Sequence, residues 1–357
     1  MDIESKIELI KKSPTEEIIT EEELREKLKT GEKLKHYIGF EISGLLHLGT
    51  LIICGDKIND LIKAGVNCTV YLADWHSYIN KKLGENWDNI IKASKYYEEA
   101  FNFYCPGVNI VLGSQFYYNN NEYWKDLIRF ATQVNLTRIT RCLSIMGRSE
   151  KENLSFAQYI YPSMQAVDVK YLGQDIAHGG MDQRKVHVLC REVFPKLGWK
   201  KPILLHHHLI MGLGEPTKKE FKDKFELVEA YKMSKSKPWT AIFIHDTEEE
   251  IEKKILRAWC PEKAVEMNPI LEIVKYVIFN KRKSFEVERE SKYGGKITYY
   301  SYYDLEKDYI NGNLHPLDLK KNVARVLNEI LEPIRKHFEY PSLKKLVEEI
   351  KSFEITR

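Results

Sequence analysis

The chain has 357 residues, of which 43% are hydrophobic and 30% are charged, and its formal net charge is +3. This length is enough for two domains, and the balanced charge excludes a protein that is strongly basic or acidic overall but leaves nucleic acid open as a partner. No stretch reaches the roughly 20 apolar residues of a transmembrane helix. The N-terminal segment MDIESKIELIKKS is charged and lacks the apolar core of a signal peptide, so we expect a cytoplasmic protein.

The six cysteines are scattered along the chain, and none forms the C-x-x-C spacing that is common in zinc sites. This pattern indicates reduced, mostly buried thiols. We therefore expect no structural metal ion. The cysteines are Cys54, Cys68, Cys105, Cys142, Cys190 and Cys260.

Residues 1–33 are charged and predict an N-terminal helical extension. Over residues 34–244, short apolar stretches alternate with stretches of helical period, which predicts an α/β domain with a parallel sheet. Ligands of such sheets bind at the carboxyl ends of the strands. The expected strands cover 34–40, 68–74, 108–114, 174–180 and 202–208, and the expected helices between them cover 48–64, 86–105, 121–146, 163–171 and 182–194.

The segment 212–237 is rich in glycine and lysine and predicts a loop. After about residue 245 the strand pattern fades, and the periodicity predicts a mainly helical second domain over 245–357. Its first helix is expected to begin at Asp246 or Thr247, because either side chain can cap a helix and the glutamates that follow favour a helix N-terminus.

The first segment whose residues could bind a ligand is YIGFEISGLLHLGT, residues 37–50. A strand is expected to end near Phe40, and a helix is expected to start between His47 and Gly49. Backbone amides at such a helix start can bind phosphate oxygens, and His47 can add a further donor. By itself, such a segment is more often a glycine-rich turn with a core or capping histidine.

The second segment is KMSKS, which runs from Lys232 to Ser236 in the expected loop. Two lysines on a loop can close over a triphosphate and neutralise the charge that develops on a leaving pyrophosphate. By itself, this segment also fits a solvated surface loop.

Together, in this order and at this separation, the two segments resemble the HIGH and KMSKS signatures of class I aminoacyl-tRNA synthetases. The pair is far more specific than either member. The last position of the first signature is Thr50 in this chain and not histidine, so the usual second histidine is missing. The resemblance implies a Rossmann-like catalytic domain over 34–244, followed by an anticodon-binding domain over 245–357.

The third segment, YPSMQAVDVKYLGQDIAHGGMDQRK, covers residues 161–185. Tyr161, Gln165 and Asp168 share one face of the expected helix, an arrangement that also fits a solvated polar face. Asp182 and Gln183 follow the next expected strand, and a ligand site is expected at the carboxyl end of such a strand. The segment resembles the tyrosine-binding region of archaeal and eukaryotic tyrosyl-tRNA synthetases, and further likeness in YLADWHSYIN, GSQF and NLHPLDLK extends the resemblance over roughly 34–338.

The resemblance implies roles for individual residues. Tyr37 and Asp168 should bracket the phenolic hydroxyl of tyrosine, and Lys232 and Lys235 should clamp the pyrophosphate. At Tyr71 the family often has a smaller apolar residue. The ammonium group is assigned to Tyr161, Gln165 and Gln183, and the ring pocket to His76 and Phe116. ATP is assigned to Gly39, His47, Gly49, Thr50, Gly180, Asp182 and Ser234, with the ribose on Asp182 and Mg²⁺ bound through the phosphates and water.

For tRNA, the resemblance assigns the acceptor end to Arg141, Arg184 and Lys185, and the anticodon to Tyr293, His315 and Asp318. Basic residues at helix ends are also ordinary surface. An aromatic side chain can stack on a base, and a carboxylate can accept from a base edge. A homodimer is implied by the resemblance and by the apolar helical stretch from Leu127 to Leu143.

There are three alternatives to a tyrosine enzyme, and one of them, another α/β nucleotidyltransferase, would not explain the second domain. A tryptophanyl-tRNA synthetase would share the fold, but an indole has no hydroxyl for Tyr37 and Asp168 to hold. A non-catalytic RNA-binding relative would have no need for an intact KMSKS segment. The run His206-His207-His208 lies on an expected strand, where neighbouring side chains point to opposite faces, so it favours a satisfied histidine cluster over a metal site.

Overall fold

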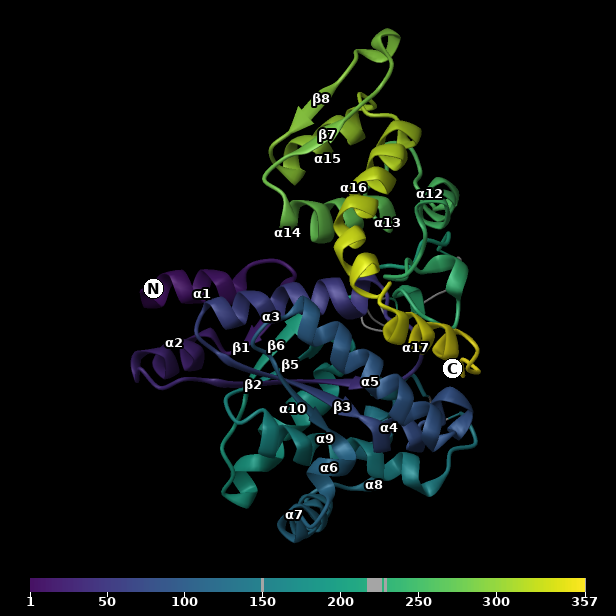
Figure 1. Ribbon diagram of the computed structural model, residues 1–357. Coiled ribbons are helices and arrows are strands. Elements are labelled where there is room, and N and C mark those ends of the chain that lie inside the picture. The colour runs from purple at the N-terminus through teal and green to yellow at the C-terminus, as the bar shows by residue number, and fades with distance from the viewer. Residues whose placement is uncertain (149–150, 217–226, 228–229, 357) are drawn as a thin grey trace. The chain divides into compact units, whose positions relative to one another are not determined.

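The computed structural model describes residues 1–148, 151–216, 227 and 230–356 (Figure 1). The chain folds into two compact units. The first unit contains Met1–Gly44, Cys54–His208 and Leu346–Arg357, and the second contains Leu45–Ile53 and Leu209–Lys345. Among the described helices, none is long and apolar enough to cross a membrane.

The first unit is built on a six-stranded sheet with the order β1-β6-β5-β2-β3-β4. All neighbouring strands run parallel except β1, which pairs antiparallel with β6. The five strands expected from the sequence are confirmed within a few residues at each end. The strands are β1 (Thr15–Ile19), β2 (Lys35–Glu41), β3 (Asn67–Ala73), β4 (Asn109–Leu112), β5 (Ile176–Gly180) and β6 (Ile203–His207).

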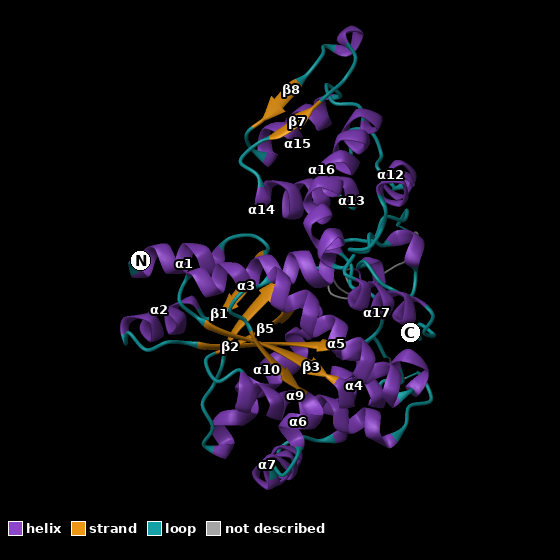
Figure 2. Ribbon diagram, in the orientation of Figure 1, coloured by secondary structure: helices purple, strands orange, loops and turns teal. Residues whose placement is uncertain are grey.

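Helices cover both faces of this sheet (Figure 2). Helices α3 (Cys54–Lys63) and α5 (Trp87–Tyr104) pack on one face, and α9 (Phe156–Leu172) and α10 (Arg184–Val193) pack on the other. The chain thus runs outward from β2 to β4 on one side, then returns to build β5 and β6 on the other. The remaining helices of this unit are α1 (Ile3–Lys11), α2 (Glu21–Lys29), α4 (Asp74–Ile79), α6 (Gly113–Tyr117), α7 (Asn121–Ala131) and α8 (Leu136–Cys142).

This strand order makes β2 and β5 the point at which the chain reverses its direction across the sheet. In open α/β sheets the connections at such a point leave in opposite directions, so a crevice forms outside the carboxyl ends of the two strands. The segments that follow β2 and β5 are those in which the sequence places ligand-binding residues.

The expected helical extension over 1–33 holds α1 and α2, but strand β1 lies between them, so the expectation was incomplete. The sequence of β1, TEEII, resembles helix because of its two glutamates. In the structure Glu17 accepts from His206 and Glu16 pairs with His208, so the neighbouring strand satisfies both carboxylates.

The helix expected over 121–146 is divided into α7, α8 and the 3₁₀ turn Leu143–Met146. The division has a local cause, because Asn135 accepts a hydrogen bond from the backbone of Arg138 and so starts a new helix. The helix expected over 48–64 begins as the π-helical turn Leu48–Ile53 and continues as α3.

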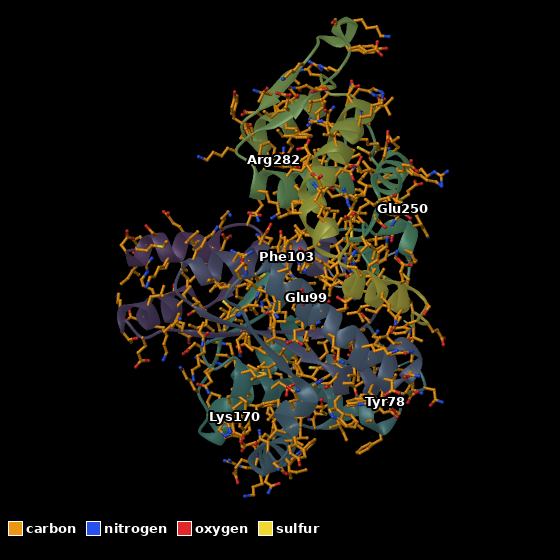
Figure 3. The ribbon with its side chains drawn as sticks, in the orientation of Figure 1. Tyr78, Glu99, Phe103, Lys170, Glu250 and Arg282 are labelled. Carbon is orange, nitrogen blue, oxygen red and sulfur yellow. The ribbon has the colours of Figure 1, made fainter. Side chains whose placement is uncertain are left out.

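The second unit is mainly helical. Its helix α12 (Glu248–Arg257) is capped by Thr247, one of the two expected positions, and Thr247 and Glu250 form a capping box. Figure 3 labels Glu250. A small hairpin joins strands β7 (Phe285–Val287) and β8 (Ile297–Tyr299). The other helices are α13 (Pro269–Ile273), α14 (Phe279–Lys281), α15 (Tyr302–Asn311), α16 (Pro316–His337) and α17 (Pro341–Lys351), which ends in the first unit.

The two units reflect how the chain packs, and they do not coincide with the expected boundaries at 34 and 245. The functional division into a catalytic and an anticodon-binding domain stays a prediction. The expected loop 212–237 lies partly outside the described residues, which within it are 212–216, 227 and 230–237.

Candidate active site

Asp168 is the centre of a buried polar cluster in the first unit. It lies on α9, and its side chain is fully buried. The hydroxyls of Tyr117 and Tyr123 each lie 2.9 Å from its Oδ1 and donate to it. Burial raises the pKa of Asp168 to about 8, and the hydrogen bonds from Tyr123 and Tyr117 oppose that rise.

The second oxygen of this carboxylate has no hydrogen-bond donor among the described residues. His76 Nε2 lies 3.4 Å from Asp168 Oδ2, but without the geometry of a hydrogen bond, and neither nitrogen of His76 has a partner there. Burial lowers the pKa of His76 to about 3, so its ring is neutral at physiological pH. Buried polar atoms are normally paired, so an unpaired carboxylate oxygen indicates where a ligand donates.

The other sequence-predicted ring residues belong to the buried cluster that contains Asp168. Tyr37, on β2, is buried and lies near Tyr71, with the two ring centroids 5.8 Å apart. Burial and the nearby Asp168 raise the pKa of Tyr37, so its phenol stays protonated and can donate. Phe116 contacts the rings of Tyr71 and Tyr123 edge-on. The expected group of Tyr37, His76, Phe116 and Asp168 therefore belongs to one buried aromatic cluster.

The expected ammonium-binding residues form a polar rim. Tyr161 donates to Glu41 Oε1 at 2.8 Å, and Asn80 donates to the same oxygen at 2.8 Å. Gln165 donates to Gln183 at 3.0 Å, and Gln183 donates to the backbone oxygen of Ile145. The rim thus presents carboxylate and amide oxygens, which suit an ammonium group.

Sequence reasoning missed four members of this site: Tyr117, Tyr123, Glu41 and Asn80. Glu41 is the last residue of β2, at the carboxyl end of a parallel strand, and that position was the available signal. Tyr117 and Tyr123 follow β4 in the same way, just after the segment GSQF.

The phosphate-binding candidates of the second unit surround His47. Its Nδ1 accepts the backbone N–H of Gly49 at 3.1 Å, so the ring proton lies on Nε2, which is 3.1 Å from the hydroxyl oxygen of Thr50. Burial, with contributions from Lys235 and Lys232, lowers the pKa of His47 to about 3. The Nε2 proton faces the Thr50 hydroxyl here, and a neutral ring N–H of this kind can donate to a phosphate oxygen that replaces that hydroxyl. A Cβ at Gly49 would lie 3.1 Å from both His47 and Ile210, so this turn favours glycine.

The HLGT and KMSKS segments come together within this unit. Ile210 links them, because a Cβ at Gly49 would lie 3.1 Å from its side chain and the backbone N–H of Met233 donates to its backbone oxygen at 2.8 Å. Lys232 pairs with Met211 through the backbone, and the hydroxyls of Ser234 and Ser236 lie 3.0 Å apart. The structure thus places two cations and a neutral histidine donor in one neighbourhood, as a triphosphate requires.

The remaining nucleotide candidates lie in the first unit. Asp182 follows β5 in a 3₁₀ turn and is half-buried. Gly180 is the last residue of β5. A Cβ at Gly39 would lie 2.6 Å from the hydroxyl of Tyr37, so only glycine leaves that hydroxyl in place.

The residues expected to contact tRNA differ in their exposure and in their partners. Arg141 is exposed, and Lys185 donates to the hydroxyl of Ser144 at 3.0 Å. Arg184 is engaged with Glu17, which it contacts at 2.9 Å. In the second unit, Tyr293 is 60% exposed, and His315 and Asp318 lie at the start of α16, where His315 caps the helix.

The histidine run on β6 divides as expected between the two faces of the sheet. His206 contacts Glu17 and His187, whereas His207 contacts His178 and the thiol of Cys54. The expected burial of the cysteines is confirmed for five of them, and Cys260 is half-buried.

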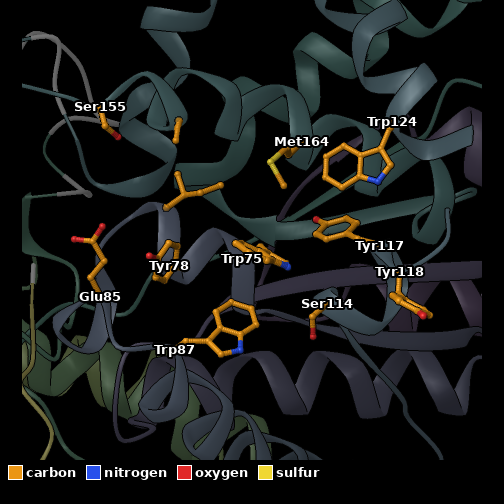
Figure 4. Close-up of a pocket in the computed structure, with 12 residues that line it drawn as sticks. Trp75, Tyr78, Glu85, Trp87, Ser114, Tyr117, Tyr118, Trp124, Ser155 and Met164 are labelled. Carbon is orange, nitrogen blue, oxygen red and sulfur yellow. The ribbon is translucent and has the colours of Figure 1, made fainter. Parts of the chain in front are cut away.

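An aromatic groove of about 600 Å³ opens in the first unit (Figure 4). Trp75, Trp87, Trp124 and Met164 line it, together with Tyr117, whose hydroxyl reaches Asp168. The groove and the buried cluster around Asp168 thus share Tyr117.

Comparison with known proteins identifies the family. Residues 29–332 match the family described as tRNA synthetases class I (W and Y). The chain is 47% identical to the tyrosine–tRNA ligase of Thermococcus kodakarensis and 45% identical to that of Pyrococcus furiosus, with 98% and 100% of this chain and 99% and 100% of the relatives covered. It also resembles the crystal structure of the tyrosyl-tRNA synthetase of Pyrococcus horikoshii complexed with L-tyrosine, at 44% identity and a TM-score of 0.91 over 98% of this chain and 100% of that one. The chain therefore belongs to the archaeal-type class I tyrosyl-tRNA synthetases, a family of aminoacyl-tRNA synthetase enzymes.

Proposed function

We propose that this enzyme reads the hydroxyl of tyrosine with Asp168, activates the amino acid with ATP and transfers it to tRNA. The observation that carries the proposal is the oxygen Asp168 Oδ2, which is buried among aromatic rings without a donor from the described residues. The phenol of tyrosine supplies that donor, and Tyr37 can donate to the oxygen of the same phenol. Phenylalanine has no polar group on its ring, and the indole of tryptophan can donate to the carboxylate but has no oxygen that could accept from Tyr37, which favours tyrosine over both.

In the first step, a carboxylate oxygen of tyrosine attacks the α-phosphorus of ATP, and the bond to the bridging oxygen of pyrophosphate breaks. Charge builds on the pyrophosphate, which Lys232 and Lys235 neutralise while the N–H of His47 donates to a phosphate oxygen. Asp182 binds the ribose, and the acceptor oxygens of Gln165 and Gln183 hold the ammonium group. No residue of the chain has to form a covalent intermediate, so positioning and charge supply the rate.

Magnesium enters with ATP in this proposal. The described residues contain no group of three or more histidine, cysteine, aspartate or glutamate side chains that could hold a metal ion. A Mg²⁺ ion commonly keeps several water ligands and binds substrate phosphates, so we propose that the nucleotide carries it.

In the second step, a hydroxyl of the 3′-terminal ribose of tRNA attacks the carbonyl carbon of tyrosyl-adenylate. AMP leaves, and the proton of the hydroxyl is lost. We assign the acceptor end to Arg141, Arg184 and Lys185 and the anticodon to Tyr293, His315 and Asp318. The exposed ring of Tyr293 supports a stacking role. The catalytic domain is assigned to 34–244 and the anticodon-binding domain to 245–357.

We further propose a cytoplasmic homodimer. Three large apolar side chains in or near α7 and α8 stay exposed: Trp124 at 44%, Ile128 at 66% and Leu136 at 67%. They fall within or beside the apolar stretch from Leu127 to Leu143. A second copy of the chain would bury them, and exposed apolar clusters of this kind are typical of subunit interfaces.

The experiment that tests this function is pyrophosphate exchange with ATP and each amino acid in turn. Exchange that depends on tyrosine, with far less for phenylalanine and tryptophan, supports the proposal. Exchange that depends on tryptophan would identify the other member of the family. An absence of exchange with every amino acid would instead favour a non-catalytic RNA-binding protein.

A further inference from the structure

Three tyrosines that the proposed reaction does not use converge on Asp168. Tyr71 comes from β3, Tyr117 from the end of α6 and Tyr123 from α7. Their side chains are 1%, 5% and 0% exposed. Each hydroxyl is hydrogen-bonded, so the three rings do more than fill the core with apolar surface.

The direction of each hydrogen bond follows from counting protons, with the carboxylate ionised. Tyr117 has one hydroxyl proton and donates it to Asp168 Oδ1 at 2.9 Å. Tyr71, whose oxygen lies 2.5 Å from that of Tyr117, must then be the donor in their mutual bond. Tyr123 lies 2.9 Å from Asp168 Oδ1 and 3.2 Å from the backbone oxygen of Met164, and the charged acceptor is the stronger of the two.

The result is an uneven carboxylate. Oδ1 receives two donors, whereas Oδ2 receives none from the described residues. Two fixed donors on one oxygen hold the plane of the carboxylate, because rotation would break both bonds. The other oxygen is thereby kept as an open acceptor, with His76 beside it.

We propose that Tyr117 and Tyr123, with Tyr71 behind Tyr117, are positioning residues that set the selectivity of this enzyme for tyrosine over phenylalanine. They act through Asp168: they keep its Oδ2 open and aimed at the substrate hydroxyl. This inference rests on the proposed role of Asp168 in reading that hydroxyl. It also accounts for the hydroxyls of Tyr71, Tyr117 and Tyr123, each of which is hydrogen-bonded.

Electrostatics point the same way. A buried carboxylate prefers to be neutral, and a neutral carboxyl group accepts a phenol proton less strongly than an ionised one. The hydrogen bonds from Tyr123 and Tyr117 lower the pKa of Asp168 against the effect of burial. Loss of either hydroxyl should therefore leave Asp168 less often ionised and free to turn.

The test uses Tyr117→Phe and Tyr123→Phe, which keep each ring and remove one hydroxyl. The readout is the ratio of kcat/KM for tyrosine to kcat/KM for phenylalanine in pyrophosphate exchange, measured as a function of pH. The ratio cancels the titration of the ammonium group, which both substrates share. We expect each variant to lower the ratio about tenfold and to move its midpoint to higher pH.

Two further variants sharpen the test. Tyr71→Phe removes a donor one bond further from Asp168, so it should change the ratio in the same direction but less. Its smaller disturbance also keeps the proposal testable if either of the other variants fails to fold. The matched control is Tyr104→Phe, which removes a hydroxyl that donates to Asp56 at 2.8 Å elsewhere in the same unit. It should leave both the ratio and the midpoint unchanged.

The outcomes separate this inference from the role of Asp168. In one outcome, Asp168→Asn lowers the ratio, but Tyr117→Phe, Tyr123→Phe and Tyr71→Phe leave both the ratio and the midpoint unchanged. The three hydroxyls are then structural, so this inference is overturned while the proposed role of Asp168 stands. If Asp168→Asn itself keeps the wild-type ratio, the proposed role of Asp168 fails and the inference fails with it.

Discussion

The residues around Asp168 and those around His47 are held in contrasting ways. Asp168 is fully buried, and two tyrosine hydroxyls fix one of its oxygens. The lysines near His47, Lys232 and Lys235, are half-buried and belong to the KMSKS segment, outside any regular helix or strand. The first group is organised before a ligand arrives, whereas the second presents charge on adjustable side chains. On the proposed function, the buried cluster around Asp168 selects the amino acid and the lysines act on the transition state.

The largest effect is expected from the lysines. Lys232→Ala and Lys235→Ala should each slow adenylate formation by a factor on the order of 10² to 10³, because each removes a charge that acts on the leaving pyrophosphate. The dissociation constant of tyrosine should stay nearly unchanged. Single-turnover kinetics measures the first quantity, and equilibrium binding measures the second.

Lys237→Ala is the matched control, since Lys237 is an exposed lysine immediately beyond the KMSKS segment. It should retain wild-type adenylation. If the Lys232 and Lys235 variants instead weaken tyrosine binding and leave adenylation intact, the lysines bind the amino acid and do not act on the transition state, which would contradict the proposed roles.

A smaller effect is expected at the anticodon residues. Tyr293→Ala should reduce tRNA charging about tenfold, the order of magnitude for loss of one base stacked on an aromatic ring, and should spare pyrophosphate exchange. Tyr340→Ala is the control, because Tyr340 is similarly exposed, at 65% against 60%. Equal losses in charging and exchange would mean that Tyr293 supports the fold and does not recognise RNA.

Much of the fold was predictable because buried parallel strands appear in the sequence as short continuous apolar stretches. The five apolar stretches become β2 to β6, and Thr247 caps its helix as one of two expected residues. Strand β1 escaped prediction because its stability comes from a distant partner. Its glutamates suggest helix, and only pairing with His206 and His208 makes them suit a strand.

Those residues of the candidate site that share one face of a helix could be predicted from their spacing in the sequence. Tyr161 and Asp168 do lie together on α9, both buried. The partners of Asp168 could not be inferred in this way, because Tyr117 and Tyr123 come from two other helices some 45 to 51 positions away along the chain. Nothing in local sequence indicates that two hydroxyls will meet one carboxylate oxygen.

The smallest effect concerns stability. The folded pKa of Asp168, about 8, lies above the unfolded value of 3.8, so ionisation favours the unfolded chain. Asp168→Asn should therefore gain thermal stability relative to wild type as pH rises from about 4 to about 8, with no further gain above that range. Calorimetry of both proteins without ligands, compared at each pH, cancels the contribution of the buried histidines. A stability difference that does not vary with pH would contradict a raised pKa for Asp168.

The central claim, that Asp168 reads the hydroxyl of tyrosine, is tested most directly by the amino-acid preference of Asp168→Asn in pyrophosphate exchange at a pH above about 8, where the wild-type carboxylate is ionised. Asparagine keeps the shape of the side chain but removes the charge that accepts the phenol proton, and an unmade hydrogen bond to a buried charged group costs about 3 kcal/mol or more. The account predicts that the ratio of kcat/KM for tyrosine to that for phenylalanine falls by roughly two orders of magnitude, mostly through poorer use of tyrosine, whereas Asp56→Asn, a change at another buried aspartate that accepts from a tyrosine, keeps the wild-type ratio. An Asp168→Asn enzyme that keeps its full preference for tyrosine would contradict the account.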